Sequence, residues 1–118
     1  MSLYQKKHDF ETRLKESKRI RDRYPDRIPI IMEKHTSLQS SASMNQTKFL
    51  VPEMITISEL LYILRKRIKL EPQQALFIFI NNMTPSSSDI IKTIYSTHAE
   101  EDGFLYITYS TENTFGYA

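Results

Sequence analysis

Residues 56–80 read TISELLYILRKRIKLEPQQALFIFI, and this stretch predicts a helix that leads into a strand. Thr56 and Glu59 form a capping box, in which each side chain accepts a hydrogen bond from the other residue's backbone N–H group at a helix start. The larger apolar residues that follow recur at helical spacing until Pro72: Ile57, Leu60, Leu61, Leu64 and Ile68. The run LFIFI at 76–80 is apolar throughout, so it predicts a buried central strand.

Upstream of this stretch, the pattern predicts one helix and two strands. Apolar residues lie among Arg and Lys from Phe10 to Tyr24, as expected for a one-faced helix that Pro25 ends, and residues 3–8 can add a short helical turn. The segments IPIIMEK at 28–34 and KFLV at 48–51 have strand composition, and a polar loop joins them. We therefore expect a hairpin with a long, exposed connection.

Downstream, the pattern predicts a short helix and a last strand. NNMTPSSSD supplies turn residues, IIKTIY at 90–95 suits a short helix, and FLYITYS at 104–110 suits a strand. Gly103 permits a turn into that strand, because glycine adopts backbone conformations that other residues avoid. The expected order is a helix followed by ββαβαβ, with no internal repeat, which is an α+β fold.

Composition limits the classes of function. The chain has 118 residues, which suits one domain, and it has no cysteine, which excludes disulfides, thiolate zinc sites, a cysteine nucleophile, prenylation and palmitoylation. The net charge is only +2, but residues 1–27 hold nine Lys or Arg and five Asp or Glu residues, and RKRIK at 65–69 is a second basic cluster. Solvated helix faces explain both, and attraction of an acidic partner is the sharper alternative.

The usual signatures of catalysis are missing from the sequence. The three histidines His8, His35 and His98 are scattered, and no motif joins any of them to a nucleophile. Two glycines cannot build a phosphate-binding loop or a nucleophile elbow. HAEED at 98–102 is better explained as an acidic loop than as a metal site. We therefore expect a protein that is not an enzyme, with no catalytic residue and no metal ligand.

A small basic nucleic-acid-binding α+β domain is the alternative from a different class. The basic cluster RKRIK and the aromatic strands could in principle contact phosphates and stack on bases. The RNA-recognition fold, however, has βαββαβ order and glycine-spaced aromatic residues on its third strand, and FLYITYS has neither that position nor a glycine. A basic helix and an aromatic core are the simpler explanation.

Several segments together resemble the autophagy-related protein eight family, which includes the GABARAP-like and light-chain-three proteins. They are RYPDRIPIIMEK at 23–34, KFLVP at 48–52, RKRIKL at 65–70, ALFIFINN at 75–82, EEDGFLYITYS at 100–110 and the late FG. The resemblance implies a ubiquitin-like β-grasp, a four-stranded mixed sheet, with two additional N-terminal helices. It implies a helical extension over 1–25, the β-grasp over 26–110 and a flexible tail over 111–118.

The resemblance also gives a role to the terminal residues TENTFGYA. It implies that a cysteine protease cuts after Gly116, next to Phe115, and removes Tyr117 and Ala118. Enzymes similar to ubiquitin-activating and ubiquitin-conjugating proteins would then join the Gly116 carboxylate to phosphatidylethanolamine, with no other cofactor. Glycine suits this role because no Cβ crowds its carbonyl group. The implied protein is cytoplasmic and monomeric in solution, reaches the autophagosome membrane through this lipid and binds no nucleic acid.

A second implied activity is the binding of autophagy receptors and adaptors through aromatic-x-x-aliphatic peptides, each adding a strand to a sheet edge formed by KFLVP. Strand alternation sends Lys48 and Leu50 to one face and Phe49 and Val51 to the other. The residues implied for the two pockets are Glu16, Ile20, Pro29 and Phe104 in the first, and Pro52, Ile55, Leu60 and Ile63 in the second. A further basic surface is implied at Arg27, Arg65 and Arg67. Taken singly, Leu50, Val51 and Leu60 are better explained as core residues, and only their match to the family pattern favours a role in the pockets.

Two residues and one loop depart from the pattern of this family. Asp9 stands where many of its members have proline, Gln46 replaces a common basic residue near the implied pocket, and the loop 37–47 is rich in serine. These departures bear on which partners are preferred, and they do not alter the implied class.

Overall fold

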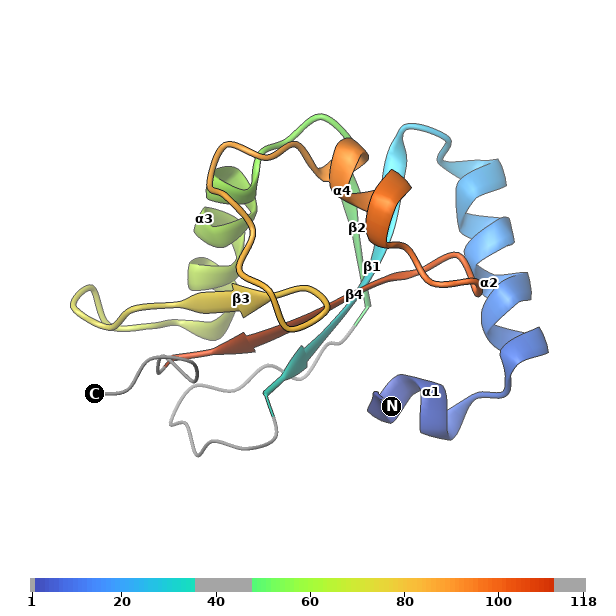
Figure 1. The fold of residues 1–118 in the computed structure, drawn as a ribbon, viewed down its shortest axis with the longest axis horizontal. Coiled ribbons are helices and arrows are strands. Elements are labelled where there is room, and N and C mark those ends of the chain that lie inside the picture. The colour runs from blue at the N-terminus through green and yellow to red at the C-terminus, as the bar shows by residue number, and fades with distance from the viewer. Residues whose placement is uncertain (1, 36–47, 112–118) are drawn as a thin grey trace.

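The computed structural model describes residues 2–35 and 48–111, which form four helices and four strands (Figure 1). The elements in chain order are α1 (Leu3–Lys7), α2 (Phe10–Arg23), β1 (Arg27–Lys34), β2 (Lys48–Pro52), α3 (Ile57–Ile68), β3 (Phe77–Phe79), α4 (Ile91–His98) and β4 (Leu105–Ser110). The order after the N-terminal helices is ββαβαβ, as the sequence predicts.

The four strands form one mixed sheet in the order β2-β1-β4-β3. The central pair β1 and β4 is parallel, with Ile30 opposite Leu105, and each of these strands has an antiparallel neighbour on its other side. In the antiparallel hairpin, Ile30 lies opposite Phe49. The predicted hairpin and four-stranded mixed sheet are confirmed, and β2 lies at one edge, as the resemblance implies.

The sequence predicts that the strand at 76–80 is central in the sheet, and this prediction is wrong. The strand β3 has three residues and lies at the other edge of the sheet, so the central strands are β1 and β4. The residues at 76–80 are apolar because this edge strand is buried on both faces of the sheet. Ile78 and Ile80 join the main core, whereas Phe79 packs edge-on against the ring of His35 on the opposite face, at 5.8 Å between ring centroids.

The helix ends follow the capping signals closely. The Thr56–Glu59 capping box is present at the start of α3, as predicted. This helix ends at Ile68, before Pro72, because Lys69 adopts a left-handed conformation with φ of 53°. The short helix expected at 90–95 continues to His98, so α4 is longer than predicted.

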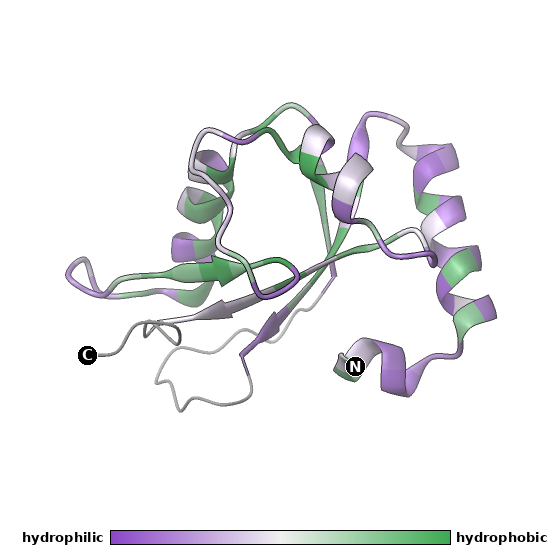
Figure 2. Cartoon of the chain, viewed as in Figure 1, coloured by the Kyte–Doolittle hydropathy of each residue, from purple (hydrophilic) through white to green (hydrophobic). Residues whose placement is uncertain are grey.

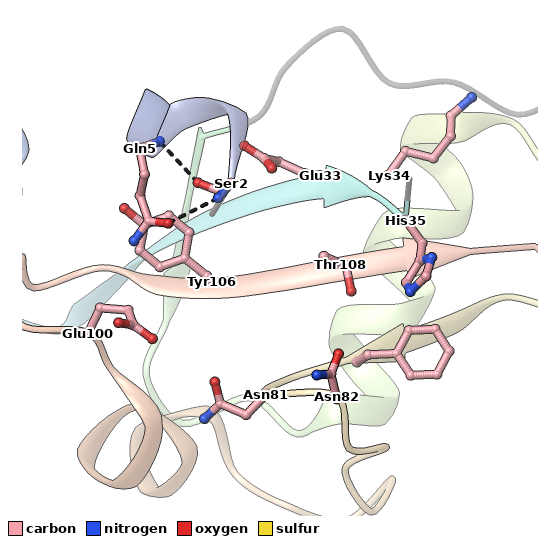
Figure 3. A pocket seen from close by; sticks show the side chains of 11 residues that line it. Ser2, Gln5, Glu33, Lys34, His35, Asn81, Asn82, Glu100, Tyr106 and Thr108 are labelled. Atoms are coloured by element: carbon pink, nitrogen blue, oxygen red, sulfur yellow. Dashed lines mark hydrogen bonds between the residues drawn. The ribbon is translucent and has the colours of Figure 1, made fainter. Parts of the chain in front are cut away.

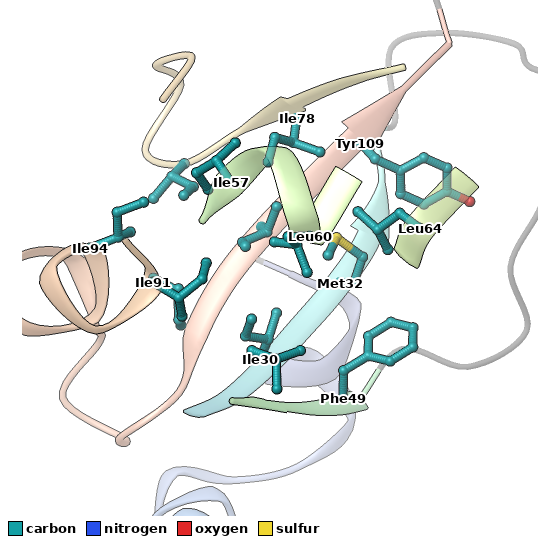
Figure 4. Packing of buried hydrophobic residues seen from close by; sticks show 14 of the residues in the cluster. Ile30, Met32, Phe49, Ile57, Leu60, Leu64, Ile78, Ile91, Ile94 and Tyr109 are labelled. Atoms are coloured by element: carbon teal, nitrogen blue, oxygen red, sulfur yellow. The ribbon is translucent and has the colours of Figure 1, made fainter. Parts of the chain in front are cut away.

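The main core lies between the sheet and the helices α3 and α4 (Figure 4). Alternate strand residues such as Ile30, Met32 and Ile107 point to this side and are at most 1% exposed. The α3 stripe of Ile57, Leu60, Leu64 and Ile68 covers them. Figure 2 shows the same division, with apolar residues along the strands and a largely hydrophilic α2.

A smaller apolar cluster lies on the opposite face, where α1 and α2 pack. Its buried members are Ile20 of α2, Ile31 of β1 and Phe104, and Tyr4, Leu50 and Tyr106 pack against them. Figure 1 shows both helices on the side of the sheet away from α3, and beside them two pockets remain open on this face. The second layer is therefore thin, and it leaves surface open beside α2.

A buried carboxylate joins α2 to the sheet. Asp102 is 1% exposed, and its Oδ2 accepts hydrogen bonds from Arg13 Nη1 and the Tyr106 hydroxyl, both at 2.5 Å, while Oδ1 accepts the backbone N–H of Phe104 at 3.0 Å. Burial, followed by the bond to this carboxylate, raises the pKa of Tyr106.

Next to Asp102, the predicted turn residue Gly103 has φ of +90°, and a Cβ there would lie 2.3 Å from Ser17 Oγ. The turn therefore requires glycine for its conformation and for its closeness to α2.

We expect Asp102→Ala to lower the free energy of unfolding by about 3–5 kcal/mol, because it leaves the nearly buried Arg13 guanidinium without its carboxylate partner. Urea unfolding measures this change. The matched control is Glu101→Ala, which alters an exposed neighbour and should cost less than about 0.5 kcal/mol. Equal stability of the two variants would contradict a structural role for the buried carboxylate.

Candidate functional site

The edge strand β2 forms the floor of the candidate site. It pairs with β1 on one side, and no described strand pairs with its other side. Leu50 lies opposite Pro29 and packs on the α2 side with Ile20 and Phe104, whereas Phe49 and Val51 join the main core. The predicted alternation of β2 side chains between two faces is therefore confirmed.

Beside β2, a pocket of about 430 Å³ opens on the α2 side. We call it the α2 pocket, and its lining residues are Tyr4, His8, Thr12, Lys15, Glu16, Arg19 and Lys48. Of the residues expected in the first pocket, Glu16 lines it directly, together with Lys48. Ile20, Pro29 and Phe104 are buried, so they lie under this surface as support.

Glu16 links the helix α2 to the edge strand. Its carboxylate accepts hydrogen bonds from Arg19 Nε at 3.0 Å, Arg19 Nη2 at 2.9 Å and Lys48 Nζ at 2.7 Å. These bonds, that of Arg19 first, lower the pKa of Glu16 to about 2. Glu16 is therefore ionised at neutral pH and holds two cations at the mouth of the α2 pocket.

The residues expected in the second pocket lie at different depths. Leu60 is 1% exposed and belongs to the main core, so its side chain is closed to a surface ligand in this structure. Ile55 and Ile63 are half-buried, and Pro52 is exposed. These three residues are the accessible part of the expected set.

The expected basic surface is partly occupied by contacts within the chain. The Arg65 guanidinium donates to the Gln74 carbonyl, and the Arg67 guanidinium lies 5.1 Å from the centroid of the Phe49 ring. Arg27 is exposed, and its backbone carbonyl accepts a bond from Arg21. The cluster therefore stabilises the surface around α3 and β2 as well as giving it positive charge.

The structure disfavours the nucleic-acid alternative. Stacking on bases requires exposed rings on the sheet. Among the aromatic residues of the candidate strands, Phe79, Phe104 and Tyr109 are at most 3% exposed, and Phe77 and Tyr106 are half-buried. Those rings serve as packing groups.

Comparison with known proteins decides the family. The family model described as "Autophagy protein Atg8 ubiquitin like" matches residues 12–116. The chain belongs to the Atg8 family of ubiquitin-like autophagy proteins. It is 50% identical to Autophagy-related protein 8 of Schizosaccharomyces pombe over 115 residues, which cover 98% of this chain and 94% of that protein. It is 47% identical to Autophagy-related protein 8 of Gibberella zeae, covering 99% and 98% of the two chains.

Solved Atg8 structures have the same fold. The crystal structure of Trypanosoma brucei ATG8 aligns with a TM-score of 0.89 at 43% identity, covering 98% of this chain and 99% of that one. Plasmodium falciparum Atg8, solved in complex with a Plasmodium falciparum Atg3 peptide, aligns with a TM-score of 0.85 at 30% identity, covering 96% and 98%. The predicted family and the ubiquitin-like fold with N-terminal helices are confirmed.

The structure adds residues to the candidate site of this Atg8 protein that the sequence analysis missed. Thr12, Lys15 and Arg19 share one face of α2 with Glu16, and their spacing of three or four residues could have indicated this. Tyr4 and His8 come from α1 and its C-terminal cap. Tyr4 reaches the site through contact with Phe104, which no local pattern predicts.

A second pocket, of about 400 Å³, lies on the same face of the sheet beyond α1 (Figure 3). We call it the β4 pocket, and it is lined by polar groups that include Glu33, His35, Asn81, Glu100 and Thr108.

Within residues 2–35 and 48–111, no group of three or more His, Cys, Asp or Glu residues could hold a metal ion, and no helix is long and apolar enough to cross a membrane. Phe115, Gly116, Tyr117, Ala118 and Gln46 lie outside the described residues.

We expect Glu16→Gln to lower the free energy of unfolding by less than about 1 kcal/mol at about pH 7, because the ion pairs are partly exposed. The pKa of Glu16 is depressed in the folded state, so this stabilisation is complete above the unfolded value of about 4.3 and is lost as the pH falls through about 2. Urea unfolding between about pH 7 and pH 2 tests the sign, with Glu71→Gln as an exposed control. A Glu16→Gln effect that stays constant over this range would contradict the ion-pair account.

Proposed function

We propose that this Atg8 protein is a modifier that is cut after Gly116 and conjugated through the new carboxylate to phosphatidylethanolamine. In this scheme a cysteine protease hydrolyses the bond between Gly116 and Tyr117. The activating enzyme first joins the Gly116 carboxylate to a nucleotide from a nucleoside triphosphate, with release of diphosphate. A thiol of that enzyme displaces the nucleotide to form a thioester, a thiol of the conjugating enzyme takes over the acyl group, and the lipid amine displaces that thiol to form an amide. The match of the family model to residue 116 supports this position for the processing site.

Two features of the chain favour this route to the membrane. The sequence has no cysteine, so lipid attachment through a thiol is excluded. A diacyl lipid supplies two acyl chains, which meets the usual need of two signals for stable anchoring. The proposed protein is cytoplasmic before conjugation and autophagosomal afterwards. It carries no catalytic group of its own, and the chemistry belongs to its partner enzymes.

The conjugating enzyme is also expected to bind the folded domain. Plasmodium falciparum Atg8 was solved with an Atg3 peptide, and that protein shares the fold and 30% of the aligned sequence with this chain. We infer that an Atg3-like enzyme presents a comparable peptide here. Binding of this kind would bring the enzyme close to the tail that it modifies.

We further propose that receptors and adaptors bind by adding an extended aromatic-x-x-aliphatic segment to β2. The single observation that carries this proposal is the position of β2, an edge strand beside the α2 pocket. Backbone hydrogen bonds to the edge would supply affinity, and alternate side chains would supply specificity. The aromatic side chain would enter beside Lys48 and Leu50, over the apolar support of Ile20 and Phe104.

The aliphatic side chain would occupy a second, shallower position. Pro52, Ile55 and Ile63 are the accessible residues there, and Leu60 would serve as buried support. The cations Lys15, Arg19 and Lys48 around the α2 pocket suit a peptide that carries acidic residues before the aromatic residue. This charge would raise the rate of encounter more than the final affinity.

Gly116→Ala should abolish cleavage and membrane attachment and leave the melting temperature unchanged, because a methyl group at this position crowds the carbonyl at which both enzymes act. Electrophoretic mobility with and without phospholipase digestion measures conjugation. The matched control is a chain that ends at Gly116, which should conjugate without the protease. Normal phospholipase-sensitive mobility of Gly116→Ala would overturn the proposed processing site.

Leu50→Asp should weaken an acidic aromatic-x-x-aliphatic peptide by about 1–3 kcal/mol, which is roughly tenfold to a hundredfold in Kd, because it places a charge in the apolar floor of the groove. Calorimetric titration measures the affinity, and lipid conjugation should be much less affected. Met83→Asp, which changes a 63% exposed side chain outside the groove, is the matched control. Unchanged affinity in a Leu50→Asp variant that melts normally would show that the peptide binds elsewhere.

A further inference from the structure

The short helix α1 is fastened to the sheet by one carboxylate. It has five residues, too few for a stable isolated helix. The Glu33 carboxylate on β1 accepts the backbone N–H of Leu3 through Oε1 at 3.0 Å and that of Tyr4 through Oε2 at 2.9 Å. Figure 3 shows Glu33 beside the first turn of α1. Two charge-assisted bonds thus fix the orientation of this helix.

Fastened in this way, α1 contributes two rings to the α2 pocket. The Tyr4 ring lies 4.6 Å from the His8 ring and packs edge-on against Phe104 at 5.4 Å. Tyr4 and His8 both line the pocket, and we call them the aromatic wall. Glu33 lines the β4 pocket and is not part of the α2 pocket. Glu33 therefore reaches the α2 pocket through its bonds to α1.

The strand register places this wall at one end of the proposed peptide. A peptide whose aromatic residue lies at Lys48 and Leu50, and whose aliphatic residue lies at Pro52 and Ile55, runs in the same direction as β2. Its residues upstream of the aromatic side chain then extend past Lys48. Lys48 lies opposite Ile31, and Glu33 is two residues further along β1 in that direction. The upstream residues thus run toward α1.

We propose that Glu33 is a positioning residue for the peptide groove. Its carboxylate holds α1 on the sheet, so that the aromatic wall contacts an apolar side chain upstream of the aromatic residue of the motif. This inference rests on the proposed peptide-binding function. It extends the groove beyond the two motif pockets and makes a residue outside the groove a determinant of which peptides bind well.

The test compares two peptides on the full chain by calorimetric titration. The core peptide begins at the motif aromatic residue, and the long peptide carries Ser-Leu-Ser before it. The natural chain should bind the long peptide roughly threefold to tenfold more tightly than the core peptide. Glu33→Ala should remove this advantage and lower the affinity for the core peptide much less than that for the long peptide. Glu33→Gln, which keeps an oxygen that can accept one of the two bonds, should retain part of it.

Two further variants separate positioning from general stability. Glu100→Ala removes another carboxylate from the β4 pocket, one that makes no hydrogen bond to α1 within the described residues, and should preserve the advantage of the long peptide. Tyr4→Ala should remove this advantage, and Glu33→Ala added to Tyr4→Ala should cause no further loss, because both act through one wall. Thermal melting confirms that each variant is folded.

The outcomes that overturn the inference are distinct from those that overturn the proposed function. If Glu33→Ala weakens both peptides equally in a folded chain, or weakens the long peptide further in the Tyr4→Ala background, Glu33 does not act through the aromatic wall. If the long peptide has no advantage on the natural chain, the wall makes no contact with it. If the core peptide fails to bind the natural chain, the proposed groove itself is wrong, and the inference falls with it.

Discussion

The carboxylate of Asp102 is the contact on which the shape of the N-terminal half depends. A helix as basic as α2 has little apolar surface to bury, so packing alone gives it a weak hold on the sheet. Asp102 compensates by accepting bonds from Arg13 on the helix and from Tyr106 on the central strand β4. The close approach of Ser17 to the Asp102 carbonyl, at 2.5 Å, brings the helix against the turn at Gly103. The position of α2 is thus fixed by polar groups.

That position creates the candidate groove. Once α2 is held over the β1 half of the sheet, Glu16 faces the edge strand and binds Lys48. The space between the helix and β2 stays open as the α2 pocket, with buried Ile20 and Phe104 beneath it. Phe49 and Val51 anchor β2 in the main core on the other face. One strand therefore serves the core with one set of side chains and the groove with the other.

Local signals predicted most of the elements, because each depends on neighbouring residues. The capping box fixed the start of α3, and β-branched runs located the strands. The position of the strand at 76–80 in the sheet could not be predicted from its sequence. Ile78 and Phe79 are buried although this short strand lies at an edge, and an apolar run of this kind is also typical of a central strand. The resemblance to the family implies a pocket position for Leu60, whereas the depth of this side chain in the core depends on tertiary packing.

The groove was only partly predictable for the same reason. Leu50 and Lys48 follow from strand alternation, and Glu16 followed from the resemblance to the family. The contribution of α1 depends on contacts that join distant parts of the chain, Tyr4 with Phe104 and the amides of α1 with Glu33. Such contacts leave no periodic trace in a single sequence. The sites that sequence reasoning missed are therefore those built by long-range packing.

The most direct test of the central claim, that β2 is the edge to which peptides add, is amide hydrogen exchange measured by NMR. Exchange would be followed residue by residue with and without a saturating acidic aromatic-x-x-aliphatic peptide. Addition of the peptide to β2 should slow exchange at alternate amides of β2, within residues 48–52, and leave exchange within residues 77–79 of β3 unchanged. Slower exchange at β3 with β2 unchanged would contradict the claim, because the peptide would then occupy the opposite edge of the sheet.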